Sequence, residues 1–239
     1  MNVELASIIL PIYRQAGHVE GMVRGYERGL EELAVPHETI LVFNGPDDGS
    51  LALCRKLERE FAAVRVVEHD RKGWGSAVRR GLLEAQGDLL CYTNSARTSV
   101  ETLMMILGYS LKLPGIVIKA NRKTRDSVWR HLGSLIYNLQ CRALFDLSNF
   151  DINGTPKAFP RSSAKLLDLR REDDLIDVEF LAICRAEGYL ILEVPVIVTK
   201  RHDPGSTTNI KSALKLYWGA MLLRNQLRRE GRLAEATRR

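Results

Sequence analysis

Apolar positions along the chain gather into short continuous runs, and longer segments of helical periodicity separate these runs. The first run, Ser7–Ile8–Ile9–Leu10–Pro11, does not alternate between apolar and polar residues, which is typical of a strand buried on both faces of a parallel sheet. We expect this strand to stop at the proline. Similar runs predict strands at 37–43, 64–67, 89–93, 115–120 and 189–198, with a mixed strand and turn at 150–159. Helices are predicted at 17–33, 47–61, 98–113, 127–145, 177–188 and 210–229, and a short helix follows a glycine-rich turn and ends at Gly87.

The regular alternation of strands and helices predicts an α/β fold with a mostly parallel central sheet flanked by helices. No linker rich in Pro, Gly or Ser interrupts the middle of the 239 residues. We therefore expect one α/β domain over residues 1–205 and an amphipathic, basic helical tail over 206–239. In such sheets ligands bind outside the carboxyl ends of the strands.

The composition indicates a chain with a substantial core, because 45% of its residues are hydrophobic. Residues 1–5 carry no basic leader and predict a first strand rather than a signal peptide. No apolar run approaches the roughly 20 residues that a membrane-spanning helix needs. Four cysteines occur without a CxxC pair, at positions 54, 91, 141 and 184. They are interpreted as reduced, buried thiols of a cytoplasmic protein.

The net charge of +6 is concentrated near the C-terminus, since residues 200–239 hold ten Lys/Arg against three Asp/Glu. The periodic segment 210–229 combines these charges with an apolar stripe made of Ile210, Leu214, Tyr217 and Met221, flanked by Trp218 and Leu222. This pattern fits an interfacial helix on an anionic membrane. It fits equally a helix that packs on the protein body or on a second subunit, so a homo-oligomer stays open. Nucleic acid is disfavoured as a partner, because no aromatic platform is interleaved with the basic residues.

The segment from Arg71 to Asp88 contains glycines at 73, 75 and 81 and precedes the strand 89–93. The glycine spacing is not G-x-G-x-x-G, and the segment follows the third predicted strand rather than the first. A dinucleotide-binding fingerprint is therefore rejected.

Seven short motifs occur in one order along almost the whole chain. They are Leu10–Gln15, His37–Ser50, Lys72–Asp88, Lys119–Arg122, Asp151–Phe159, Asp177–Glu179, and Glu193–Val196 with Arg201 to Ser206. In this order and spacing the chain resembles the family 2 nucleotide-sugar glycosyltransferases of the GT-A fold. The branch most similar to it transfers sugars to polyprenyl or dolichyl phosphates. The resemblance implies a nucleoside-diphosphate sugar as donor.

The resemblance places Pro11, Tyr13 and Asn44 in the nucleotide-sugar site, with Tyr13 packed on the base. Asn44 stands where the family has a base-contacting aspartate, and Gln15 stands where it has a glutamate. An amide still hydrogen-bonds a base edge, although it offers both donor and acceptor groups. An ordinary strand-end aromatic and a plain turn asparagine remain the alternatives.

The metal-binding Asp-x-Asp motif of the family corresponds here to Asn94–Ser95–Ala96. Mg²⁺ and Mn²⁺ prefer anionic oxygens, so we expect no tightly bound divalent metal, although the family implies one. Asn94 and Ser95 are retained as donor-site residues. We expect Lys72, Arg97 and Arg122, with Arg201 nearby, to neutralise the diphosphate instead. A solvated loop charge is the alternative for Arg97.

The acceptor side is implied by the family's acidic pair, which matches Asp177 and Glu179. One carboxylate would deprotonate an acceptor hydroxyl, whereas an ionised phosphate needs no base, so Asp177 would then orient it. The acids would otherwise stabilise a helix N-terminus. Asp151, Lys157 and Arg201 are assigned to the acceptor site, and His202 is expected to be a hydrogen-bonding loop residue.

These residues predict an enzyme that transfers a hexose from a nucleoside-diphosphate sugar to a lipid phosphate or similar acceptor, on the cytoplasmic side of a membrane and without metal. The alternative is a non-catalytic binding module or partner subunit that has lost its metal site.

Overall fold

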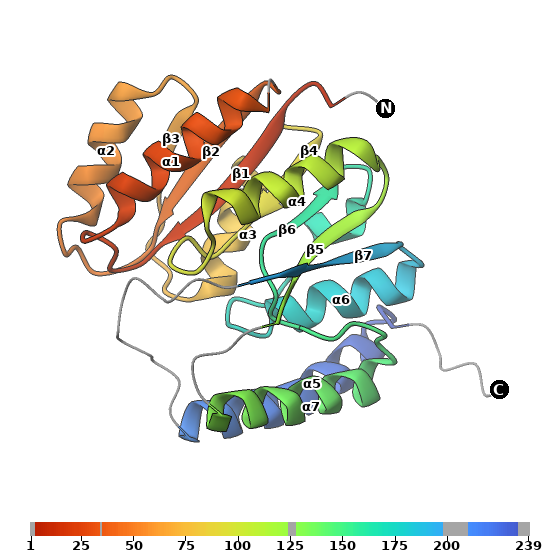
Figure 1. Ribbon diagram of the computed structural model, residues 1–239. Coiled ribbons are helices and arrows are strands. Elements are labelled where there is room, and N and C mark those ends of the chain that lie inside the picture. Colours follow the sequence, from red (N-terminus) through yellow and green to blue (C-terminus); the bar gives the residue numbers. More distant parts are fainter. Residues whose placement is uncertain (1–2, 34, 124–127, 198–209, 234–239) are drawn as a thin grey trace.

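The computed structural model describes residues 3–33, 35–123, 128–197 and 210–233. Within them, helices cover both faces of a seven-stranded sheet (Figure 1). The strands are β1 (Ala6–Ile12), β2 (His37–Phe43), β3 (Val64–Glu68), β4 (Leu89–Tyr92), β5 (Val117–Arg122), β6 (Lys157–Pro160) and β7 (Ile191–Val196). The helices are α1 (Val19–Glu32), α2 (Ser50–Glu60), α3 (Trp74–Glu84), α4 (Val100–Lys112), α5 (Val128–Phe145), η1 (Ala164–Leu167), α6 (Ile176–Glu187) and α7 (Ile210–Arg229).

The sheet has the strand order β3-β2-β1-β4-β6-β5-β7 and is mostly parallel. Only β6 runs antiparallel, between β4 and β5. The chain moves from β1 through β2 to β3 on one side and then returns to place β4 on the other side of β1. The predicted α/β class is thereby confirmed, and the sheet has a topological switch point between β1 and β4.

Strand β1 does not stop at its proline, contrary to the sequence-based expectation. It continues through Pro11 to Ile12, and both residues pair with β2. Thr93 donates its N–H to the carbonyl of Ile9, and β4 then leaves the sheet. The backbone groups of residue 11 point toward the β4 side of the strand, as those of residue 9 do. At residue 11 β4 is no longer paired with β1, so no strand is there to accept an N–H from this position. A proline therefore fits here without breaking a ladder bond.

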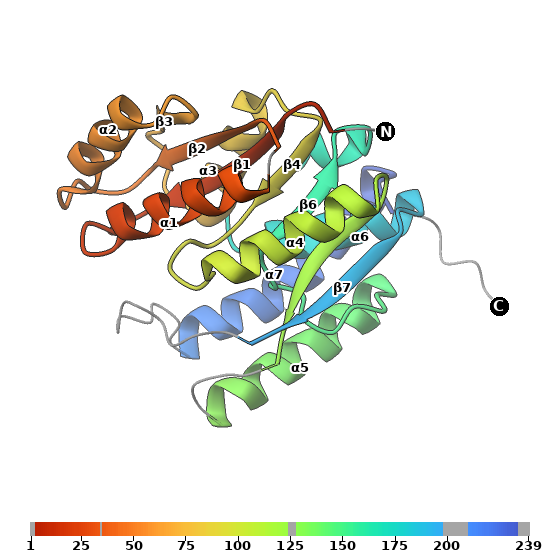
Figure 2. The ribbon, with the colours of Figure 1, turned by 45° about the horizontal axis from the view of Figure 1, so that its top comes forward.

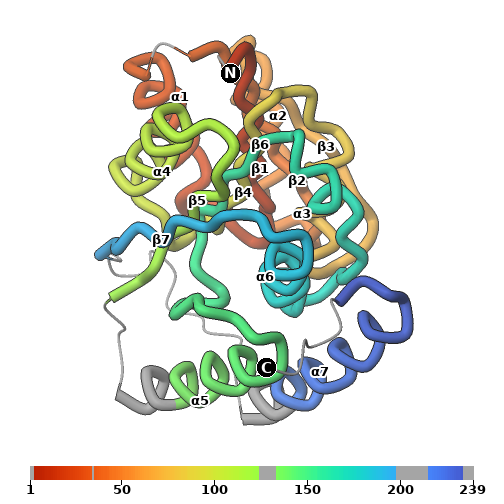
Figure 3. Tube along the Cα trace, turned by 90° about the vertical axis from the view of Figure 1, so that its right-hand side faces the viewer, coloured from red at the N-terminus to blue at the C-terminus, as the bar shows by residue number. Residues whose placement is uncertain are grey.

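The two faces of the sheet carry separate cores. Helices α1, α2 and α4 pack on one face around residues such as Tyr26, Leu57 and Leu103. Helices α3 and α6 cover the other face, and α5 and α7 complete the same core (Figure 2). Viewed from the side, α5 and α7 lie next to each other as an outer layer beyond α6 (Figure 3).

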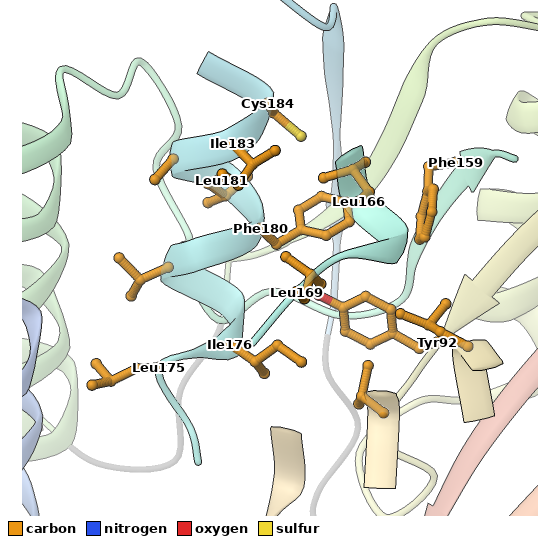
Figure 4. Packing of buried hydrophobic residues seen from close by; sticks show 14 of the residues in the cluster. Tyr92, Phe159, Leu166, Leu169, Leu175, Ile176, Phe180, Leu181, Ile183 and Cys184 are labelled. Carbon is orange, nitrogen blue, oxygen red and sulfur yellow. The ribbon is translucent and has the colours of Figure 1, made fainter. Parts of the chain in front are cut away.

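The core beside α6 contains aromatic rings that pack edge to face. The ring of Phe180 makes edge contacts with Tyr92 and with Phe159, at centroid distances of 5.8 and 5.4 Å. Figure 4 shows these rings between α6 and the strands, with Leu166 and Leu169 beside them. Such pairs add about 0.5–1.5 kcal/mol beyond their buried area. The four cysteines are buried and free, as predicted.

Helix α4 begins at Val100, two residues after the predicted start of this helix at residue 98. Ser99 is the N-cap, and its hydroxyl accepts the N–H of Thr102. Thr98 is buried, and its hydroxyl shares a 2.7 Å hydrogen bond with Thr93.

Helix α7 packs on the protein body, as one of the two readings of its pattern predicts. The buried residues are Ala220, Leu223 and Leu227, however. Among the members of the predicted stripe whose burial is described, only Tyr217 packs against this core, and it is partly buried. The other members for which burial is described, Trp218, Met221 and Leu222, are exposed. In the part of the chain that the structure covers, no helix combines the length and apolarity needed to cross a bilayer.

Candidate functional site

The candidate site lies at the carboxyl edge of the sheet, where β1, β2, β4 and β5 end in the same direction. Loops 13–18 and 93–99 leave this edge on either side of the switch point. Diverging connections at such a point leave a crevice, which is the usual place for a ligand in an open α/β sheet. The residues assigned to the nucleotide-sugar site occupy these loops and the neighbouring turn 44–49.

Tyr13 presents an aromatic ring at the end of β1. Its side chain is 42% exposed, although it follows a fully buried strand. The ring lies against the backbone of Gly45, because a Cβ at that position would come within 2.9 Å of Tyr13 Cδ2. Arg14 follows with a left-handed φ of 51° and places its guanidinium 5.8 Å from the ring centroid. An exposed ring on a glycine shelf is suited to stacking with a planar ligand.

Asn44 holds the glycine-rich turn that precedes α3. Its Nδ2 donates to the carbonyls of Arg71 and Gly73, at 3.2 and 2.8 Å. Gly73 adopts a φ of 126°, which favours glycine. The predicted contact of Asn44 with the nucleotide base is untested, and the amide nitrogen of Asn44 already holds this turn. Lys72 lies in the turn and is exposed.

The start of α3 packs closely on segment 171–173. A Cβ at Gly75 would lie 2.6 Å from the carbonyl oxygen of Arg171 and 2.7 Å from that of Asp173. Ser76 donates its N–H to the carbonyl of Glu172. The glycines of this turn therefore serve close backbone packing between α3 and the segment before α6.

The loop after β4 is tied to the loop after β1 by Gln15. Ser95 Oγ donates to Gln15 Oε1 at 2.6 Å, and Gln15 Nε2 donates to the carbonyl of Pro11 at 3.3 Å. Ser95 and Gln15 are both buried. Asn94 uses its side-chain oxygen to accept the N–H of Ala96 at 3.1 Å.

This donor set does not fit a hard divalent cation. Such a cation needs several anionic oxygens, whereas the tip after β4 offers an amide and a hydroxyl that are already hydrogen-bonded. Across the described residues, no group of three His, Cys, Asp or Glu side chains is arranged to hold a metal. Arg97 follows the tip with a half-buried side chain.

Asp177 lies on the first turn of α6 and accepts three hydrogen bonds. They come from Tyr92 Oη at 2.9 Å, from Trp74 Nε1 at 3.2 Å, and from Lys157 Nζ. Lys157 is fully buried and pairs with β4 opposite Tyr92. Burial lowers the pKa of Lys157 to about 8, although the carboxylate opposes this shift. The predicted acceptor residues Lys157 and Asp177 thus form a buried ion pair below the carboxyl edge.

Arg122 and Asp151 form a second ion pair at the end of β5. The guanidinium binds both carboxylate oxygens, with Nε–Oδ2 and Nη2–Oδ1 distances of 2.7 and 2.8 Å. Burial lowers the pKa of Arg122, but the bonds to Asp151 outweigh burial and leave the pKa above its usual range. Beside them, the buried Lys119 donates to Glu193 and to the carbonyl of Asp151.

Glu179 points away from Asp177, because residues two apart on a helix lie on different sides. Its carboxylate accepts the N–H groups of Arg170 and Arg171 and the guanidinium of Arg232, at 2.7–3.0 Å. Glu179 is fully buried. It therefore holds the segment that packs on the start of α3, and joins it to the chain just after α7.

The structure brings some of the predicted residues together and separates others. Tyr13, Asn94 and Ser95 lie in the two loops that flank the switch point, Asn44 follows the neighbouring strand β2, and Lys157 bonds Asp177. Lys72, Arg97 and Arg122 leave the edge from β3, β4 and β5, and β6 separates β4 from β5. Arg201 and His202 lie outside the described residues.

Sequence reasoning missed Trp74, Tyr92 and Arg232. Each binds an acid that is 53 to 103 positions away along the chain. The one local signal was the presence of Trp74 beside Gly73 and of Tyr92 at the last position of an apolar strand, since a buried Trp or Tyr needs a polar partner.

Comparison with known proteins identifies relatives of this arrangement. The profile of "Glycosyl transferase family 2" matches residues 7–95, which include β2 to β4, β1 from its second residue, and the switch point. Undecaprenyl-phosphate 4-deoxy-4-formamido-L-arabinose transferase of Pseudomonas aeruginosa is 24% identical over 71% of this chain and 51% of its own. Cholesterol galactosyltransferase of Borreliella burgdorferi is 23% identical over 62% of this chain and 38% of its own. The chain thus spans about half or less of the length of these curated relatives.

Solved structures show the same fold over nearly the whole chain. Glucosyl-3-phosphoglycerate synthase from Mycobacterium tuberculosis, in complex with Mn²⁺, UDP-glucose and phosphoglyceric acid, superposes with a TM-score of 0.73. The match covers 98% of this chain and 82% of that one at 17% identity. The motif order, the sheet with its switch point and the profile match agree: residues 7–95 of this chain match glycosyltransferase family 2, and the chain as a whole has a GT-A-like fold.

Proposed function

We propose that the protein transfers a hexose from a nucleoside-diphosphate sugar to a lipid phosphate or a similar anionic acceptor. The observation that carries this proposal is the exposed Tyr13 ring on its Gly45 shelf, at the β1/β4 switch point. Two of the three reported relatives support an anionic acceptor, whereas cholesterol galactosyltransferase is named for a neutral lipid. One group transfers a sugar to undecaprenyl phosphate, and the structural relative was solved with phosphoglyceric acid.

On the donor side, the base stacks on Tyr13, and Pro11 and Asn44 shape the pocket around it. The diphosphate lies between the turn that carries Lys72 and the loop that carries Asn94, Ser95 and Arg97. Lys72 and Arg97 supply positive charge, and the guanidinium of arginine suits phosphate because it donates two parallel hydrogen bonds. Arg122 contributes less charge than the sequence suggested, because it is paired with Asp151.

Transfer proceeds by single displacement. An oxygen of the acceptor attacks the anomeric carbon, the bond from that carbon to the diphosphate oxygen breaks, and the nucleoside diphosphate leaves. An ionised phosphate oxygen needs no general base. This suits Asp177, whose carboxylate is already neutralised by Lys157. The two act as a buried, positioning pair beneath the acceptor, and the Arg122–Asp151 pair lies on the acceptor side. Arg201, outside the described residues, is assigned to the acceptor by the motif order alone.

The reaction is proposed to run without a divalent metal, since the donor set after β4 does not fit one. The leaving diphosphate still requires positive charge in the transition state. The cationic side chains of Lys72 and Arg97 supply it. Glu179 acts by holding segment 170–171 rather than by touching substrate, because its carboxylate is fully occupied.

The competing proposal is a binding module that no longer catalyses transfer, and the replacement of acids by Asn94 and Ala96 favours it. The transferase and the binding module are distinguished by incubating the protein with radiolabelled UDP- or GDP-sugars and undecaprenyl phosphate, either in EDTA or in Mn²⁺. Labelled lipid formed in EDTA supports metal-independent transfer. Label that forms only with Mn²⁺ rejects the metal-free mechanism. Nucleotide binding without labelled lipid favours the module.

A further inference from the structure

We propose that the outer face of the α5–α7 helix pair docks on an anionic membrane surface. This proposal goes beyond the transfer reaction and stands without it. The face consists of exposed apolar residues on both helices, and basic residues accompany them. The residues are Leu135, Ile136 and Leu139 from α5, and Trp218, Met221 and Leu222 from α7.

The two helices form one layer with a shared inner side. Tyr137 and Cys141 of α5 and Ala220 and Leu223 of α7 are buried in the same core. The helices are joined along their length by hydrogen bonds between facing sides. Tyr217 Oη donates to the carbonyl of Gly133 at 2.6 Å, Gln140 Nε2 donates to the carbonyl of Tyr217 at 3.0 Å, and Arg224 Nε donates to the carbonyl of Leu144 at 2.7 Å.

The exposed apolar residues point away from that core. Leu139 follows Tyr137 by two positions and Trp218 precedes Ala220 by two, and such a spacing on a helix is a turn of about 200°. Leu139 is 66% exposed and Trp218 is 64% exposed. Because the helices lie side by side (Figures 1 and 3), their outer residues form one continuous surface. Contiguous apolar patches of this kind mark interaction sites.

The charge of the helix pair favours an anionic membrane over a second copy of the chain as the binding partner of this face. The sequences of α5 and α7 contain seven Lys/Arg and no Asp or Glu. Lys215, Arg228 and Arg229 are exposed on α7. A second copy of the chain, docked through the same face by two-fold symmetry, would set these cations against themselves. Anionic lipid headgroups are complementary to them, and an apolar face with tryptophan and a basic rim is the pattern of an interfacial helix.

The position of the α5–α7 helix pair relative to the sheet determines how the candidate site would be oriented toward the membrane. Helix α5 follows β5 in the chain and α7 follows β7, and both helices begin on the side of the molecule where these parallel strands end (Figure 1). A protein that rests on a bilayer through this layer would hold that edge close to the lipid surface. A lipid-borne acceptor would then be within reach of the candidate site.

The test is co-sedimentation of the full chain with vesicles of phosphatidylcholine alone and of phosphatidylcholine mixed with phosphatidylglycerol. We expect binding to the anionic vesicles only, and less binding as NaCl is raised. The double variant Leu139→Ser/Trp218→Ser should lose this binding. Arg228→Gln/Arg229→Gln should weaken it about 30-fold, because each basic residue near an anionic surface contributes about fivefold. Leu83→Ser, which removes an equally exposed leucine from α3, is the matched control and should bind as the wild type does.

Circular dichroism melts establish that each variant is folded before its binding is compared. The proposal is overturned if the wild type sediments with neither kind of vesicle, or if the outer-face variants bind as tightly as Leu83→Ser. It is also overturned if analytical ultracentrifugation shows a dimer that Leu139→Ser/Trp218→Ser dissociates, since a second copy would then cover the face. None of these outcomes bears on donor binding, which is measured separately with soluble nucleotides.

Discussion

Replacing Lys157 with methionine should destabilise the protein strongly, although methionine fills a similar volume. Lys157 Nζ is the only cation bonded to Asp177 among the described contacts, and the Asp177 side chain is 5% exposed. In Lys157→Met the carboxylate keeps the neutral donors Tyr92 and Trp74 and loses its charge partner. Removing one member of a buried pair costs about 3–5 kcal/mol. In a chain of this size, that corresponds to a fall in Tm of roughly 10 °C.

The double variant Lys157→Met/Asp177→Asn is the matched control. Asparagine carries no charge, its oxygen can still accept from Trp74 Nε1, and its NH₂ group can donate to the Tyr92 hydroxyl, which also accepts, so we expect the double variant to recover about 2 kcal/mol. Urea unfolding at neutral pH, followed by far-UV circular dichroism, measures the free energies of unfolding. A loss below about 1 kcal/mol in Lys157→Met, or no recovery in the double variant, would refute the claim that the pair is buried and coupled.

Three further predictions follow from the same structure. The pKa of Lys157 falls from 10.5 to about 8 on folding, so the unfolded chain binds more protons between these values. The wild type should therefore gain up to about 3 kcal/mol relative to Lys157→Met/Asp177→Asn as the pH rises through that window, and the buried cysteines cancel in the difference. Tyr13→Ala should weaken nucleoside-diphosphate binding about tenfold in calorimetry, while Tyr13→Phe keeps the ring and the affinity, and equal affinities would reject stacking. Gly75→Ala should lower the free energy of unfolding by about 1–3 kcal/mol, because its Cβ meets two backbone carbonyls. Gly108→Ala, with open space around it in α4, should be neutral or stabilising, and similar losses in both variants would contradict the close packing.

The fold could be predicted in outline because its signals are local. A strand buried on both faces is mostly apolar, so the apolar residues within 7–11 and 37–43 predicted two of the strands directly. The end of β1 was wrong because a proline is harmless where the neighbouring strand has already left, and the sequence does not show where β4 ends. The sequence predicted the wrong buried face for α7, because its apolar residues lie on two faces, one packed on the protein and one exposed.

The candidate site was predictable only in part. Motif order places Tyr13 and Ser95 at the edge of the sheet, but hydrogen-bond partners depend on tertiary packing. Asp177 and Glu179 read as one acidic pair, yet the helix sends them to opposite sides and gives them separate cations. Arg122 read as a free cation, yet Asp151 neutralises it. Ion pairs and hydrogen bonds between residues so far apart in the chain cannot be predicted from the local sequence.

The central claim is that the switch point between β1 and β4 binds a nucleoside diphosphate through the protein's own side chains, without a divalent cation. Calorimetric titration of the wild type with UDP and with GDP, first in EDTA and then in Mn²⁺, tests it most directly. The account predicts that one of the two nucleotides binds in EDTA with an affinity that Mn²⁺ leaves unchanged. Binding that appears only after Mn²⁺ is added, or that is absent under both conditions, would contradict it.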